Sequence, residues 1–99
     1  MSTVTATPPS PSQRRVLDAL ADARLRALPQ DALLAEAARL TADVEMAALL
    51  RGDFAPLWSA VTEFAANGYL SAEDDEQVRL RLRRCRERVR KALALPPGS

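Results

Sequence analysis

The chain has 99 residues, no histidine and a single cysteine, Cys85. A zinc site built from Cys and His is therefore excluded within one chain, as are an intrachain disulfide and histidine-based acid–base catalysis. A lone cysteine also favours a reducing, cytoplasmic setting. We predict a cytoplasmic protein that is not an enzyme and that uses neither a metal nor a cofactor.

Long apolar runs are missing as well. No stretch approaches the roughly 20 apolar residues that span a bilayer, so we expect no membrane partner. Residues 1–13 lack the basic region and the apolar stretch of a signal peptide.

Residues that favour β-strands are scarce, since the chain has no isoleucine and four aromatic residues in all. Alanine, leucine and arginine dominate, and all three are strong helix formers. No segment alternates apolar and polar residues convincingly, so the pattern predicts an all-α fold.

Apolar residues recur at helical spacing in four segments, which predicts helices over about 11–28, 31–51, 53–67 and from 71 to 93 or 95. Short turns between them indicate a small antiparallel bundle of three to four helices. We expect a disordered tail over 1–10, a bundle domain over 11–95 and a C-terminal tail over 96–99. A domain of this size is marginally stable alone, so it is expected to gain from homo- or hetero-oligomerisation.

The ends of these helices carry capping residues. Ser10 begins a capping box, and Ser71 begins the last helix. Gly52 is expected to supply the left-handed residue that closes the second helix, with Asp53 as the cap of the third. Gly68 is expected to end the third helix in the same way.

Charge is segregated along the chain although the net charge is only +1. Residues 16–76 hold twelve acids and four bases, a net charge of −8, whereas residues 77–99 hold eight bases and one acid, a net charge of +7. This asymmetry points to the C-terminal segment as the most informative part of the chain.

The last predicted helix is basic and has an apolar seam at steps of four and three. Cationic residues flank this seam on both sides, in the manner of the e and g positions of a coiled coil, so parallel self-pairing is disfavoured and a helix with acidic flanks is favoured. The candidate partner-binding residues are Arg79, Arg81, Leu82, Arg86, Arg88 and Val89.

Three interpretations of this helix remain open. Its arginines can face the acids of the first three helices, with their stems covering apolar surface. They can bind a separate acidic protein. Binding of nucleic acid is less favoured, because no stacking-aromatic pattern or glycine loop accompanies the charge and the acidic body would repel a duplex.

The third predicted helix holds three of the four aromatic residues, and its apolar face is either core or the lining of a binding groove. We favour core, with Trp58 buried, because the chain has few large residues elsewhere. The residues of this face are Phe54, Leu57, Trp58, Val61 and Phe64.

One segment resembles the helical-hairpin turn of flagellar and type III secretion export chaperones. Its sequence is Ala47-Ala48-Leu49-Leu50-Arg51-Gly52-Asp53-Phe54-Ala55-Pro56-Leu57-Trp58. The step Leu70-Ser71-Ala72-Glu73 into a basic last helix is also similar, and the resemblance covers about residues 33–93. The chain departs from the pattern at Pro56 and in the short third helix. The resemblance implies a small helical bundle that holds a secretion substrate or regulator in an apolar groove.

These observations predict a non-catalytic helical domain that binds another protein, as an adaptor, an export-chaperone-like subunit or a small regulator. The expected partner is helical with acidic flanks. The alternative is a nucleic-acid-associated regulator that uses the basic C-terminal helix.

Overall fold

The computed structural model describes residues 8–93, which form α-helices, one 3-10 helix and no strand. The all-α prediction is confirmed. Of the predicted N-terminal tail at 1–10, residues 1–7 lie outside the described residues, whereas residues 8–10 are described and Ser10 caps the first helix. The predicted C-terminal tail at 96–99 and the alternative helix end at 95 also lie outside the described residues. The helices are α1 (Pro11–Ala19), α2 (Asp22–Ala27), α3 (Gln30–Ala42), α4 (Val44–Leu50), η1 (Arg51–Asp53), α5 (Phe54–Asn67) and α6 (Ala72–Ala92).

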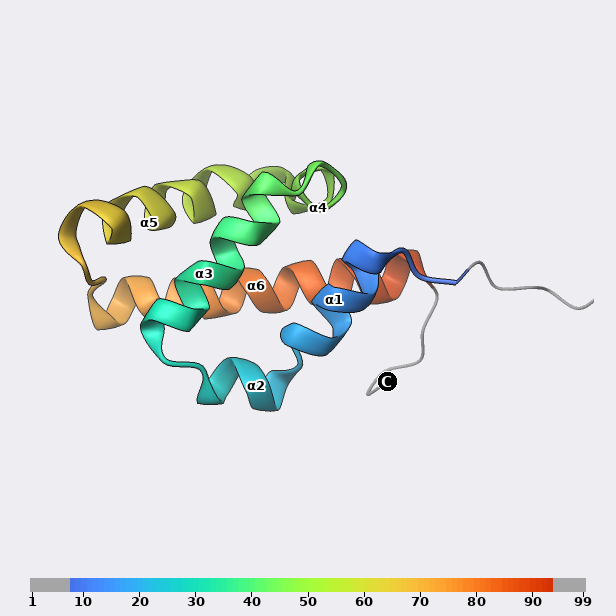
Figure 1. The fold of residues 1–99 in the computed structure, drawn as a ribbon, viewed down its shortest axis with the longest axis horizontal. Helices are drawn as coiled ribbons and strands as arrows, with labels where there is room; N and C mark the ends of the chain where they lie inside the picture. Colours follow the sequence, from blue (N-terminus) through green and yellow to red (C-terminus); the bar gives the residue numbers. More distant parts are fainter. Residues whose placement is uncertain (1–7, 94–99) are drawn as a thin grey trace, which may run out of the picture.

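Helix α6 is the longest element, and it contacts each of the other five α-helices (Figure 1). Helix α5 turns back along α6 through a short connection, whereas α3 crosses both obliquely (Figure 1). Because α6 contacts all of the other α-helices, this basic helix is the central element of the fold and not an appendage to it. None of the helices within residues 8–93 is both long and apolar enough to cross a membrane.

Three predicted caps are present. Ser10 and Gln13 form the reciprocal capping box, with 3.1 Å from the Gln13 amide nitrogen to Ser10 Oγ and 2.9 Å from the Ser10 amide nitrogen to Gln13 Oε1. Ser71 Oγ accepts a hydrogen bond from the backbone nitrogen of Asp74 at 3.1 Å. Gly68 ends α5 in the left-handed conformation, with φ of 80°.

The first two predicted helices are each broken into two, which corrects the continuous segments 11–28 and 31–51. The first break falls at Leu20–Ala21 between α1 and α2, and the second at Asp43. Asp43 caps α4 through the backbone nitrogen of Met46 at 3.2 Å, and it accepts a 2.6 Å hydrogen bond from the Ser12 hydroxyl. Because Ser12 belongs to α1, a tertiary contact holds the second break in place.

The predicted turn chemistry at the end of α4 is wrong by one residue. Arg51 has a positive φ of 51° with ψ of −120°, and Gly52 does not have a positive φ. The Asp53 side chain makes no capping bond to α5, so the predicted cap is wrong as well. That carboxylate is buried and turned to α6 instead.

The core is aliphatic. Every α-helix contributes to it, and α6 contributes the predicted seam as far as Val89. Ala92, the next residue of the predicted seam, is exposed. The seam residues are Val78, Leu82, Cys85 and Val89, and each is at most 2% exposed.

The aromatic face of α5 packs against the core except at Trp58, where the prediction of a buried side chain is wrong. Leu57 is fully buried, but Trp58 is 51% exposed, and Phe54, Val61 and Phe64 are partly buried. Leu57 lies at the centre of the buried stripe of α5, and residue 58 is rotated by about 100° from it. The large size of the indole is therefore not sufficient to bury it.

We therefore expect Trp58 to fluoresce as a partly exposed indole that iodide quenches readily. Trp58→Ala should lower the free energy of unfolding by about 1 kcal/mol, since roughly half of the side chain is already in water. Leu57→Ala on the same helix should lower it by about 2–5 kcal/mol, because it leaves a cavity. A blue-shifted, unquenched emission from the folded protein would contradict this position of the indole.

Candidate partner-binding site

The functional candidate is α6, whose sequence supports a long helix at both ends. Acidic residues occupy its first turn and basic residues its last turn, as the helix dipole favours. Its apolar seam is buried inside the molecule, so the remaining positions decide which charges face the protein and which face water.

Four arginines beside the seam have contacts within the molecule, and we call them the inner arginines: Arg79, Arg81, Arg86 and Arg88. Arg81 Nη1 lies 2.7 Å from Asp53 Oδ1, and Arg86 Nε donates to the carbonyl of Leu17 at 3.3 Å. Arg88 Nη1 donates to the carbonyls of Leu49 at 3.1 Å and Leu50 at 2.7 Å. These carbonyls end α4, so Arg88 caps that helix.

Asp53 is a buried carboxylate that pairs with three arginines of α6. Its carboxylate, 4% exposed, pairs with Arg81 at 2.7 Å, Arg84 at 3.2 Å and Arg88 at 3.1 Å. The contact from Arg88 to Oδ2 has an ion-pair distance without hydrogen-bond geometry, which leaves Oδ2 a buried acceptor with no hydrogen bond. One negative charge therefore meets three positive charges, and the cluster keeps an excess of two.

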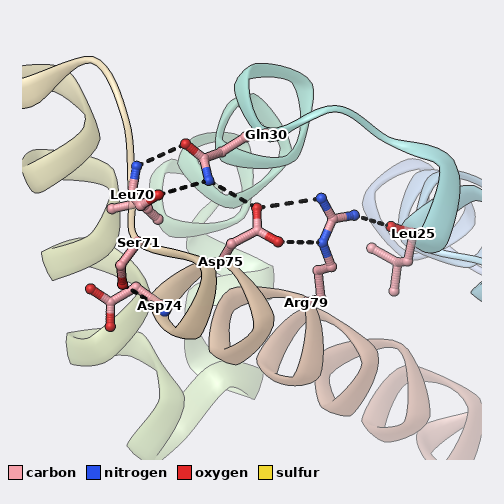
Figure 2. Close-up of polar contacts among 7 residues, drawn as sticks. All are labelled: Leu25, Gln30, Leu70, Ser71, Asp74, Asp75 and Arg79. Carbon is pink, nitrogen blue, oxygen red and sulfur yellow. Dashed lines mark hydrogen bonds and ion pairs between the residues drawn. The ribbon is translucent and has the colours of Figure 1, made fainter.

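A second polar cluster joins α2, α3 and the start of α6 (Figure 2). The Gln30 side chain accepts from the backbone nitrogen of Leu70 at 2.8 Å and donates to Leu70 O at 3.2 Å and to Asp75 Oδ1 at 3.1 Å. Arg79 pairs with Asp75 at 2.7 Å and also donates to the carbonyl of Leu25 (Figure 2). The cluster fixes the α5–α6 turn against the rest of the molecule.

This second cluster makes stability sensitive to acid. The hydrogen bond from Arg79 holds the pKa of Asp75 below its ordinary value of 3.8, against an opposing effect of burial and with help from Gln30. A carboxyl with a lowered folded pKa stabilises the protein fully above its unfolded pKa, and this contribution is lost as the pH falls through the folded pKa.

We therefore expect Asp75→Asn to reduce the loss of stability between about pH 5 and about pH 3, relative to the unmodified chain. Arg79→Gln should do the same, and the double variant should add little to either single variant. Urea unfolding at the two pH values measures this. An unchanged acid dependence in both single variants would show that the pair does not couple to folding.

The outer side of α6 carries cations with fewer internal contacts. We call the residues Arg83, Arg84 and Lys91 the outer basic face; they line a hollow on this side together with the partly buried Leu80. Arg84 is half exposed, Arg83 is 44% exposed and pairs only with the exposed Asp22 at 3.3 Å, and Lys91 makes no ion pair within residues 8–93. An open hollow of about 350 Å³ runs along this side, lined by Leu80, Arg83, Arg84, Glu87, Arg88 and Lys91.

The predicted partner-binding residues all lie on α6, but their side chains have different environments. Leu82 and Val89 are fully buried, and the four inner arginines contact the protein's own body. These contacts match the interpretation in which the basic helix serves its own fold. The sequence reasoning missed Asp53, Arg83, Arg84 and Lys91. The spacing of Arg81, Arg84 and Arg88 at three and four residues is the one local signal for a shared acidic contact.

Neither a reactive cysteine nor a metal site is found among residues 8–93. Burial raises the pKa of the Cys85 thiol to about 11, so the thiolate is disfavoured at neutral pH. Within residues 8–93, no group of three or more metal-ligating side chains lies close enough to hold an ion.

Comparison with known proteins adds no functional information, because no family model, curated protein or solved structure matches the chain. The resemblance to export chaperones stays a prediction.

Proposed function

We propose that this chain is a non-catalytic protein-binding domain, an adaptor, export-chaperone-like subunit or small regulator, that binds a helical protein with acidic flanks through the outer basic face. The proposal includes a cytoplasmic setting and a bundle in which three to four antiparallel helical segments present α6. The observation that carries it is the division of charge on α6. Its inner arginines contact the body of the protein, whereas the outer cations are about half exposed or more and line a hollow together with Leu80. Of the outer cations, Arg84 also pairs with Asp53 from its exposed position.

This division gives the partner its chemistry. Leu80, Arg84, Glu87 and Lys91 follow one another at steps of four, three and four, so they form a single stripe along the outer side of α6. A partner helix with one apolar anchor between acidic flanks fits such a stripe. Charged rims of this kind favour rapid association and orientation more than raw affinity.

The test uses a 21-residue amphipathic peptide with leucines on one face and glutamates beside them, followed by fluorescence anisotropy. We expect the triple variant Arg83→Gln/Arg84→Gln/Lys91→Gln to bind it about tenfold or more weakly, which corresponds to about 1.4 kcal/mol. The control variant Arg14→Gln/Arg24→Gln/Arg39→Gln changes the net charge equally at exposed positions on other helices. It should bind the peptide with the lesser loss that general charge reduction causes.

A scrambled peptide of the same composition should bind the unmodified chain more weakly, because it lacks the apolar stripe. Equal losses in the two triple variants, or equal binding of the two peptides, would contradict a specific site. A duplex DNA of 20 base pairs forms the last arm. Tighter binding of duplex than of peptide, with a steep salt dependence, would replace the proposal by the nucleic-acid alternative.

A further inference from the structure

A second hollow lies where α4 ends beside the last turns of α6. Its lining consists of Leu49, Arg51, Arg88, Lys91 and Ala92, and its volume is about 240 Å³. Three of these five residues are cations, the other two are apolar, and no carboxylate of residues 8–93 belongs to the lining. The hollow beside the outer basic face shares Arg88 and Lys91 with this one, but its lining also includes the carboxylate of Glu87.

The cations of this hollow have N–H donors that make no contact with residues 8–93. Arg51 and Lys91 make no ion pair or side-chain hydrogen bond within residues 8–93. In its contacts with the described residues Arg88 uses only Nη1, which contacts Asp53 and the carbonyls of Leu49 and Leu50. Its Nε and Nη2 groups stay available while those contacts hold the guanidinium in one orientation, so part of an anion site is already organised.

The backbone at Arg51 is an independent sign of a site. Arg51 adopts φ of 51° and ψ of −120°, a conformation that glycine adopts readily and arginine does not. A glycine is the next residue, and a Cβ at Gly52 would meet nothing within 4 Å. The strained position is therefore occupied by a side chain that lines the hollow, although the chain has a glycine one residue away. Backbone strain of this kind clusters at functional positions.

The charge balance indicates the class of ligand. Asp53 offsets only one of Arg81, Arg84 and Arg88, and Arg51 and Lys91 add two further positive charges nearby. A carboxylate has two coplanar oxygens, which one guanidinium can satisfy. A phosphate group carries nearly two negative charges and three acceptor oxygens that can face three separate cations.

We infer that the hollow formed by Arg51, Arg88 and Lys91 is a binding site for a phosphate monoester group. The site does not depend on the protein partner proposed above, because a small phosphate compound is sufficient to occupy it. Arg88 supplies the fixed guanidinium, and Arg51 and Lys91 close on the anion from either side.

The test titrates the full chain with inorganic phosphate at constant ionic strength, followed by ¹H–¹⁵N NMR shifts of the amides at the α4–α5 junction and the end of α6. Arg51→Gly removes one cation and also relieves the backbone, so it should fold at least as well as the unmodified chain. We expect it to weaken phosphate binding at least fivefold. Arg83→Gln changes the net charge equally outside this hollow and should leave phosphate binding within twofold of the unmodified chain.

Acetate separates a phosphate site from a general anion site, and we expect it to bind at least tenfold more weakly than phosphate. Equal binding of acetate, or equal weakening by the two variants, would overturn the inference. A phosphoserine peptide and a nucleoside monophosphate then distinguish the source of the group. Stronger binding of the first assigns it to a phosphoprotein, and stronger binding of the second assigns it to a nucleotide. Loss of acidic-peptide binding in Arg83→Gln with intact phosphate binding would separate the two sites.

Discussion

Replacing Leu82 with alanine is expected to lower the free energy of unfolding by about 2–5 kcal/mol. Leu82 is fully buried at the middle of the α6 seam, and α6 contacts every other α-helix of the described chain. The substitution removes apolar burial and leaves a cavity at the point where those helices meet. In a domain of this size, a loss in the upper part of that range would abolish most of the stability.

Leu80→Ala is the matched control, since it makes the same substitution two residues away on the outer side of the same helix. Leu80 is only partly buried, so we expect a loss of about 1 kcal/mol or less. Urea unfolding at neutral pH measures both variants. Similar losses would mean that α6 does not form the core seam described here, and the partner-facing role of Leu82 predicted from the sequence would regain its basis.

Asp53→Asn is the other substitution with a large expected effect, a loss of about 2–4 kcal/mol. Removing one partner of a buried ion pair strands the other, which typically costs about 3–5 kcal/mol. The loss should be somewhat smaller here because Arg84 and Arg88 reach solvent. The remaining guanidiniums of Arg81, Arg84 and Arg88 would then repel one another without a counter-charge.

Asp22→Asn breaks the exposed pair with Arg83 and serves as the control, with an expected change within about 0.5 kcal/mol. Added salt should restore part of the stability of Asp53→Asn, since it screens the repulsion between guanidiniums. Equal stability of the two variants would show that Asp53 does not organise the arginines of α6.

Much of the fold follows from local rules. Capping by Ser10 and Ser71, the left-handed Gly68 and the seam through Leu82 and Cys85 are all visible in the sequence and present in the structure. Each depends on residues within one or two helical turns. The break at Asp43 does not, because a hydroxyl of α1 helps to hold it.

The errors have physical causes of the same kind. The sequence alone cannot show that the chain accepts strain at Arg51 instead of using Gly52, because that choice depends on what surrounds the turn. The prediction for Trp58 is wrong because the size of the indole favours burial, whereas its angle around the helix leaves it half exposed. At the site, the sequence predicts a basic helix with an apolar seam, but it does not reveal which arginines meet Asp53.

The most direct test of the division of charge on α6 compares two variants by urea unfolding. One replaces the inner arginines Arg79, Arg81, Arg86 and Arg88 with glutamine, and the other replaces Arg83, Arg84 and Lys91. We predict that the first loses about 3 kcal/mol or more, because it removes two of the three partners of a buried carboxylate and a helix cap. The second removes the half-exposed Arg84 from Asp53 but leaves Arg81 and Arg88 in place, so it should change by about 1 kcal/mol or less. Equal stability of the first variant and the unmodified chain would contradict the division of charge from which the proposed function is drawn.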